Sequence, residues 1–215
     1  MTLEYELYWS FRSPYSYLLM PRLTAFEAEY DVRCVVRPVY PIAVRTPEFF
    51  DTRDPLWRAY FMTDVFREAQ FLGLPMRWPR PDPVQSGAGG DVRIPQPYIH
   101  RLTHLGVAAA ERGRGLPFLA EASHVIWSGE VAGWHEGDHL AGAAARAGLD
   151  FAEMAAAVDA DPARYARKVH ESQEAQRAAG HWGVPLMVFN GEPFFGQDRF
   201  DQLKWRMQAA GLTRR

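Results

Sequence analysis

The sequence predicts an α/β fold in which β-strands near both ends of the chain flank a helical middle. Three observations lead to this prediction. Residues 3–9 and 32–39 have the composition of strands, strand signals are absent from about residue 41 to 165, and residues 185–195 read as two further strands. Because each half of a sheet must bury its apolar face, we expect the strands of the two ends to meet.

The composition is that of a folded protein with no sign of nucleic-acid or membrane binding. Of 215 residues, 47% are hydrophobic and 23% are charged, with a formal net charge of −2. No basic surface for nucleic acid is expected from this charge, and no apolar run approaches the roughly 20 residues of a membrane helix. The start of the chain lacks the features of a signal peptide, and the single cysteine, Cys34, cannot form an internal disulfide. We therefore expect a cytoplasmic protein.

A strand, a helix and a second strand are predicted at the start of the chain. Apolar and acidic residues alternate in residues 3–9 (LEYELYW), as is typical of a strand. Ser13 followed by Pro14 is a helix-start signal, with the serine as cap. Pro21 lies within the helical pattern, so we expect it to kink the helix or to end it early. The valine-rich residues 32–39 predict a strand parallel to the first, reached by a right-handed crossover.

Helical spacing dominates the middle of the chain. It recurs in segments that often end in a glycine: residues 55–73, 94–113, 117–131, 139–148 and 151–160. A loop rich in proline and glycine, residues 77–91, separates the first two segments. We therefore assign residues 43–164 to a helical insertion, and residues 1–42 together with 165–215 to a discontinuous domain that contains the strands.

A β-hairpin and a closing helix are predicted near the other end. Residues 185–189 (PLMVF) and 192–195 (EPFF) read as strands, and the Asn-Gly pair between them is a strong signal for a two-residue turn. The last helix is predicted over residues 197–207.

Three motifs now point to a known fold family. Residues 13–16 read S-P-Y-S at the first helix, residues 183–185 read G-V-P before the hairpin, and residues 191–199 read G-E-P-F-F-G-Q-D-R. With the order of elements, they resemble the DsbA-type thioredoxin fold, and within it the 2-hydroxychromene-2-carboxylate isomerases and the related kappa-class glutathione transferases. The resemblance spans essentially the whole chain, and it implies a thioredoxin-like domain with an all-helical insertion.

The resemblance implies a catalytic role for Ser13, where redox members of the fold place the first cysteine of C-P-x-C. A helix N-terminus carries free N–H groups and partial positive charge, so it attracts an anion. The implied anion is the thiolate of glutathione, to which the Ser13 hydroxyl donates a hydrogen bond. A free thiol titrates near about 8.5, so this stabilisation raises the reactive fraction at neutral pH. The alternative for Ser13 is a plain helix cap, and Ser16 is expected to be a small residue packed in the helix.

The resemblance also implies that the chain holds glutathione through a proline loop. A cis bond between Val184 and Pro185 would expose the backbone of Val184 to the extended tripeptide. The alternative is a strand that merely begins at a proline.

A second group of glutathione contacts is implied at the start of the last helix, with Gly196, Gln197 and Asp198 at the γ-glutamyl end. An acidic side chain suits its ammonium group, and N–H groups at a helix start suit its carboxylate. Phe195 would border the site. The alternative for Asp198 is a helix cap.

A substrate-binding region is implied just after the second strand. The isomerases that this chain resembles carry there a lysine for the substrate carboxylate, and this chain has Arg45 followed by Thr46. Arginine keeps the charge and adds a bidentate fork. Thr52 and Arg53 are the nearest candidates for the family's asparagine, which leaves the exact substrate open. The alternative for Arg45 is a solvated surface residue.

No metal site is expected. His100 and His104, like His135 and His139, are four positions apart, a spacing that can bind zinc on a helix. No cysteine lies near either pair.

Taken with its site residues, the resemblance implies a glutathione-dependent isomerase of aromatic catabolism. The glutathione thiolate would add to a conjugated small aromatic substrate, the ring would open, a bond would rotate, and the thiolate would leave. A homodimer is also implied. Two alternatives remain: a kappa-like glutathione transferase or peroxidase, and a thioredoxin-fold protein that binds a partner without catalysis. Disulfide exchange would need two thiols, and the chain has one.

Overall fold

A mixed four-stranded sheet forms the centre of the computed structural model, which describes residues 2–87 and 90–215. The strands are arranged in the order β2-β1-β3-β4: β1 (Leu3–Trp9), β2 (Val32–Pro38), β3 (Leu186–Phe189) and β4 (Glu192–Phe195). β1 runs parallel to β2 with Leu3 opposite Val32, and antiparallel to β3 with Leu7 opposite Met187. The strands from the two ends of the chain therefore meet as predicted.

Helix α1 (Pro14–Glu29) begins where the Ser13-Pro14 signal predicts. Ser13 has extended backbone angles, and its Oγ accepts the N–H of Ser16 at 3.2 Å. The expectation that the helix ends early at Pro21 is wrong. Buried side chains on both sides of the proline, Leu18 and Phe26 among them, pack into the core, and this packing outweighs the local cost of the proline.

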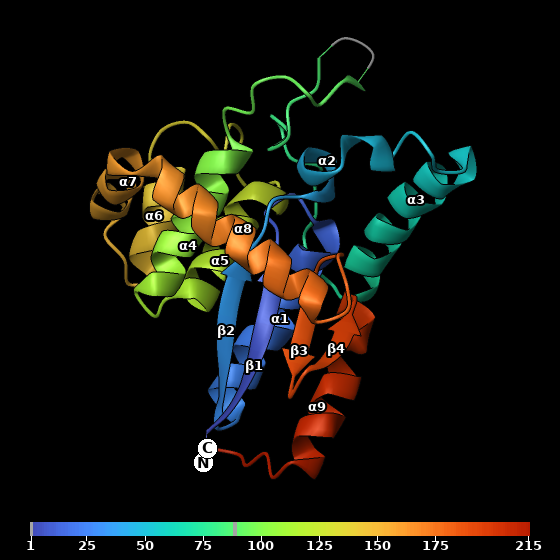
Figure 1. The fold of residues 1–215 in the computed structure, drawn as a ribbon, viewed down its shortest axis with the longest axis vertical. Coiled ribbons are helices and arrows are strands. Elements are labelled where there is room, and N and C mark those ends of the chain that lie inside the picture. Colours follow the sequence, from blue (N-terminus) through green and yellow to red (C-terminus); the bar gives the residue numbers. More distant parts are fainter. Residues whose placement is uncertain (1, 88–89) are drawn as a thin grey trace.

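The middle of the chain is helical, as predicted. Its elements are α2 (Ile42–Arg45), a 3-10 turn η1 (Pro47–Phe49), α3 (Pro55–Phe71), α4 (Ile99–Glu111), α5 (Gly115–Trp127), α6 (His139–Arg146), α7 (Phe151–Ala160) and α8 (Pro162–Ala178). Figure 1 shows α4 to α7 gathered beside β2, α8 crossing the sheet, and α3 extending on the opposite side. The predicted loop at 77–91 contains no α-helix or strand in its described part, and residues 88 and 89 lie outside the described residues.

The hairpin and the last helix follow the prediction closely. Asn190 and Gly191 both have positive φ angles, 50° and 79°, as a two-residue turn between antiparallel strands requires. The closing helix starts as a 3-10 turn, η3 (Gln197–Arg199), and continues as α9 (Phe200–Ala209).

A separate small cluster around Tyr8, Leu186 and Val188 packs against Ala175 of α8, and a large buried cluster joins the sheet to other helices. The large cluster includes Leu7 and Trp9 from β1, Leu23 from α1, and Leu119 and Trp127 from α5. This packing fixes the turn between β1 and α1, which carries Ser13. No helix within residues 2–87 and 90–215 is long and apolar enough to cross a membrane.

Candidate active site

The start of α1 presents a hydroxyl and a free backbone donor. Ser13 is partly exposed, and its hydroxyl donates to the carbonyl oxygen of Val184 at 3.4 Å, a long contact. Pro14 has no N–H, and the N–H of Tyr15 meets no acceptor among the described residues. Because the first turn of a 16-residue helix also carries partial positive charge, this position suits an anion.

The loop that faces Ser13 contains a cis peptide bond between Val184 and Pro185, as the resemblance implied. The N–H of Val184 donates to no group in the described part of the chain. Behind it, the buried amide of Gln176 donates to the carbonyl of Gly183 at 2.7 Å and holds the loop in place. A free backbone N–H therefore lies in the segment opposite the start of α1, where an extended peptide could pair with it.

Gly196 and Gln197 lie at the end of β4, next to α1. Gly196 has a φ of 103° and a ψ of 153°, which favours glycine. Gln197 is buried, and its side chain donates to the Glu68 carboxylate at 2.8 Å. Arg22 donates to the carbonyl oxygen of Gln197 at 3.0 Å. Both the side chain and the carbonyl group of Gln197 are thus already bound by other residues of the protein.

Asp198 and Phe195 are both exposed. The capping role considered for Asp198 is wrong, because its carboxylate makes no hydrogen bond at the helix start and lies 3.7 Å from Arg199. Phe195 is 43% exposed, and its ring stacks on His181 with the centroids 3.9 Å apart. Phe195 therefore contacts the loop that leads to Pro185.

Arg45 is bound to that same loop, so the solvated alternative is wrong. Its Nη2 donates to the carbonyl of Trp182 at 2.8 Å and its Nη1 to Gln176 at 3.1 Å. Burial, with a smaller contribution from the positive charge of Arg177, lowers the pKa of Arg45 to about 10. The Nε of Arg45 is buried without a hydrogen-bond partner in the described chain.

Thr46 and Arg53 lie farther along the same segment. The N–H of Thr46 donates to Ile42 and ends α2. The Arg53 guanidinium lies 3.8 Å from the centre of the Phe49 ring, and Phe49 packs edge-on against Trp182. Arg53 is thus linked to the proline loop only through Phe49, and Thr46 makes no side-chain hydrogen bond among the described residues.

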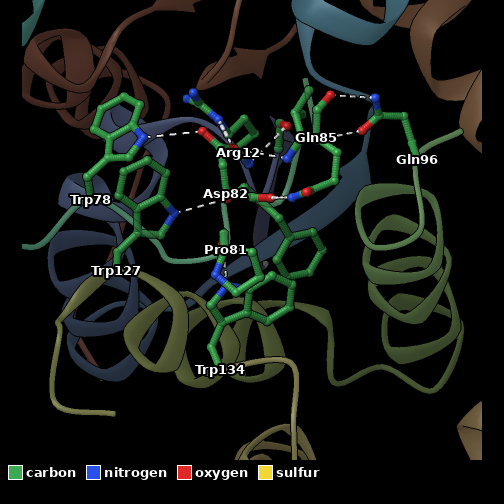
Figure 2. A network of polar contacts seen from close by, with 11 residues as sticks. Arg12, Trp78, Pro81, Asp82, Gln85, Gln96, Trp127 and Trp134 are labelled. Carbon is green, nitrogen blue, oxygen red and sulfur yellow. Dashed lines mark hydrogen bonds and ion pairs between the residues drawn. The ribbon is translucent and has the colours of Figure 1, made fainter. Parts of the chain in front are cut away.

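A polar network next to Ser13 was not predicted from the sequence. Arg12 forms an ion pair with Asp82, and its guanidinium lies 4.5 Å from the centre of the Trp78 ring. Asp82 also accepts the Trp78 Nε1–H at 3.2 Å and the N–H of Val84 at 2.9 Å (Figure 2). This network ties the loop around residue 82 to the residue that precedes Ser13.

The only cysteine lies away from this helix start. Cys34 is partly buried in β2, its N–H donates to Glu27 at 2.5 Å, and burial raises the pKa of its thiol. No group of three potential metal ligands from His, Cys, Asp or Glu occurs among the residues described. The site at Ser13 therefore offers a hydroxyl and backbone donors, and it has no thiol of its own.

Known proteins share this fold at low identity. The family model of the DSBA-like thioredoxin domain matches residues 5–208. No significant match was found among curated protein sequences. A solved 2-hydroxychromene-2-carboxylate isomerase superposes with a TM-score of 0.70 at 19% identity, over 97% of this chain and 96% of that chain.

Two further solved structures are redox proteins by name. A probable DsbA oxidoreductase from Streptomyces coelicolor gives a TM-score of 0.63 at 21% identity, over 96% of this chain and 90% of that one. The cytosolic disulfide reductase DsbM from Pseudomonas aeruginosa, solved with GSH, gives 0.61 at 18% identity, over 96% and 100%. At these identities the likeness establishes the fold alone. The chain belongs to the family of DsbA-like thioredoxin domains.

Proposed function

We propose that this protein is a glutathione-dependent isomerase acting on a small aromatic substrate similar to 2-hydroxychromene-2-carboxylate. One observation carries the proposal: the helix position that holds a reactive cysteine in redox members of the fold holds Ser13 here, opposite a cis-proline loop. A serine cannot exchange disulfides, but its hydroxyl can stabilise the thiolate of a bound small thiol.

The residues around Ser13 fit glutathione. The Ser13 hydroxyl contacts Val184 at a long 3.4 Å, so little is lost when it turns to donate to a sulfur anion. The free N–H of Tyr15 adds a second donor, and the free N–H of Val184 can pair with the tripeptide backbone. Bound glutathione would supply the sulfur nucleophile, which reversible addition to a conjugated substrate requires.

The neighbourhood of the site is consistent with the remaining glutathione assignments. Phe195, Gly196 and Asp198 lie in one segment at the far side of the proline loop, with the Asp198 carboxylate exposed and available to an ammonium group. Arg45 is anchored to the carbonyl of Trp182 in the same loop and lines a cavity that does not include Ser13, so we do not place the substrate carboxylate on it. The similar isomerase and the disulfide reductase solved with GSH support the proposal by their names.

Disulfide reduction is the less favoured candidate, although two similar structures carry redox names. It needs a thiol at the start of α1 and a partner to resolve the mixed disulfide. The one cysteine of the chain, Cys34, is partly buried in β2 with a raised pKa.

The test combines calorimetry with a rate assay. We expect glutathione to bind at millimolar concentration or below, and the isomerisation of 2-hydroxychromene-2-carboxylate to require it. Ser13→Ala should lower kcat/KM by about 10- to 100-fold, the loss of one charge-assisted hydrogen bond. Ser16→Ala is the matched control, since Ser16 is buried one turn later and its hydroxyl meets no partner among the described residues.

Three outcomes would count against the proposal. Absence of glutathione binding would favour a non-catalytic binding protein. Faster turnover of a halonitroarene than of the chromene would favour a glutathione transferase. Unchanged kinetics in Ser13→Ala, with glutathione bound as in the parent, would remove Ser13 from the mechanism.

A further inference from the structure

A second concave site lies between α2, α4 and α8. The cavity has a volume of about 690 Å³ and is lined by six residues that the inference uses: Tyr40, Arg45, His100, His104, His170 and Arg177. Neither Ser13 nor Val184 lines it. A volume of this size is typical of sites for small organic ligands.

The charge of the cavity is positive. Arg45 and Arg177 both line it, no acidic residue does, and neither arginine forms an ion pair within residues 2–87 and 90–215. The Nε of Arg45 is buried without a partner, and the depressed pKa of this guanidinium reflects its burial beside another cation. An oxyanion in the cavity would offset the repulsion between the two charges.

The wall of the cavity is built from flat rings. The Tyr40 ring lies 4.9 Å from His100, 6.1 Å from His104 and 6.0 Å from His170, measured between ring centroids. The Tyr40 hydroxyl is hydrogen-bonded to His104 Nε2 at 2.7 Å, and burial lowers the pKa of His104 to about 4. The His104 imidazole is therefore neutral at pH 7 and presents an uncharged face to the cavity.

Aliphatic side chains complete the surface. Val44 and Ala166 line the same cavity, so its polar groups are limited to the arginines, the rings and Gln173. A planar ring can pack against this wall while an oxyanion attached to it binds the guanidinium groups. The three histidines are not part of any metal-binding group among the described residues.

We propose that this cavity binds a small organic oxyanion, a carboxylate or a phosphate carried on a flat ring, at a site separate from Ser13. Arg45 and Arg177 hold the oxyanion, and Tyr40 with the histidines packs against the ring. The proposal does not depend on the glutathione chemistry at Ser13.

Calorimetric titration at pH 7 and low salt tests the charge requirement. The probes are benzoate, phenyl phosphate and benzamide, which share a ring and differ in charge. We expect benzoate or phenyl phosphate to bind at least tenfold more tightly than neutral benzamide, and the stronger of the two identifies the headgroup. The proposal would be overturned if all three probes bound equally, or if none bound at about 10 mM, a concentration that would detect even weak binding.

Two variants place the binding in this cavity. Arg177→Met should weaken binding of the preferred probe by about tenfold, whereas Arg167→Met, an exposed change on the same helix that does not line the cavity, should leave it unchanged. Ala166→Phe fills the cavity and should abolish binding. Tight binding that survives both Arg177→Met and Ala166→Phe contradicts the assignment.

A parallel titration separates this site from the proposed function. Ser13→Ala should leave the affinity for benzoate and phenyl phosphate as in the parent, whatever it does to glutathione. If Ser13→Ala weakens the binding of both probes and Arg177→Met does not, the anion binds at the helix start and the cavity proposal fails.

Discussion

The hydroxyl oxygen of Ser13 lies 3.4 Å from the carbonyl oxygen of Val184, a residue 171 positions away along the chain. One side of this contact is the first turn of α1, with its free N–H at Tyr15, and the other is the cis-proline loop. The contact is long enough for the hydroxyl to exchange its acceptor for a stronger one. A sulfur anion between the two segments would be that acceptor.

The first prediction concerns the thiolate. Ser13→Ala should raise the pKa of bound glutathione by about one unit, because a charge-assisted hydrogen bond to the anion is lost. Ultraviolet absorption of the thiolate, followed between pH 5 and 10, measures this pKa. Ser13→Thr keeps the hydroxyl and should stay within about 0.3 units of the parent. Coincident titration curves for the alanine and threonine variants would contradict the prediction.

The second prediction concerns Asp82. Asp82→Ala removes the ion pair with Arg12 and the acceptor of the Trp78 indole, which are partly buried, so we expect a loss of about 1–2 kcal/mol in the free energy of unfolding. Urea denaturation measures it. The isomerase activity proposed above should also fall, because Arg12 precedes Ser13.

The control for Asp82 is an exposed ion pair. Glu171→Ala breaks the contact with Lys168 at 3.0 Å and should change the free energy of unfolding by less than about 0.5 kcal/mol. Equal effects of the two substitutions would show that the network in Figure 2 is no more than a surface contact.

The third prediction concerns Gly183 and Phe195. A Cβ at position 183 would overlap the Phe195 ring and lie 2.9 Å from His181, so Gly183→Ala must displace the ring or the proline loop. We expect it to cost about 1–3 kcal/mol of stability and to weaken glutathione binding. In a Phe195→Ala background the same change should cost less than half as much, since the obstructing ring is gone. Simple additivity in this double-mutant cycle would refute the steric explanation.

The fourth prediction concerns pH. Burial lowers the pKa of His104 to about 4 from 6.5, so the unfolded chain binds a proton more readily than the folded one between these values. The free energy of unfolding should therefore decrease as the pH falls from 7 to 5, with His104 contributing about 2 kcal/mol of this loss.

His104→Gln removes this proton uptake. Its free energy of unfolding should change less between pH 7 and pH 5 than that of the parent, in urea denaturation at both values. His170→Gln, at an exposed position of the same cavity, serves as the control and should follow the parent. A His104→Gln variant as acid-sensitive as the parent would remove His104 as the cause.

Local signals in the sequence account for most of the fold. Ser13-Pro14 begins α1, Asn190-Gly191 turns the hairpin, and helical spacing defines the middle, because each depends on neighbouring residues alone. Pro21 was misjudged because its local cost is set against the burial of Leu18 and Phe26, which depends on the whole core.

Contacts between segments far apart in the sequence account for the features of the site that could not be predicted. Arg12 and Asp82 are 70 positions apart, and Arg45 and Trp182 are 137 apart, so nothing in one sequence relates them. The cavity beside Tyr40 is formed by α2, α4 and α8 and has no local motif. The resemblance implied the cis bond before Pro185, whereas the burial of Arg45 and Gln197 depends on tertiary packing.

The central place of β1 has a consequence for the synthesis of this chain. β1 pairs with β2 on one edge and with β3 on the other, and β3 comprises residues 186–189. During translation, one edge of β1 stays open until residues 186–189 have left the ribosome, and an open strand edge favours aggregation. Shortened versions of the protein therefore need to retain the C-terminal hairpin.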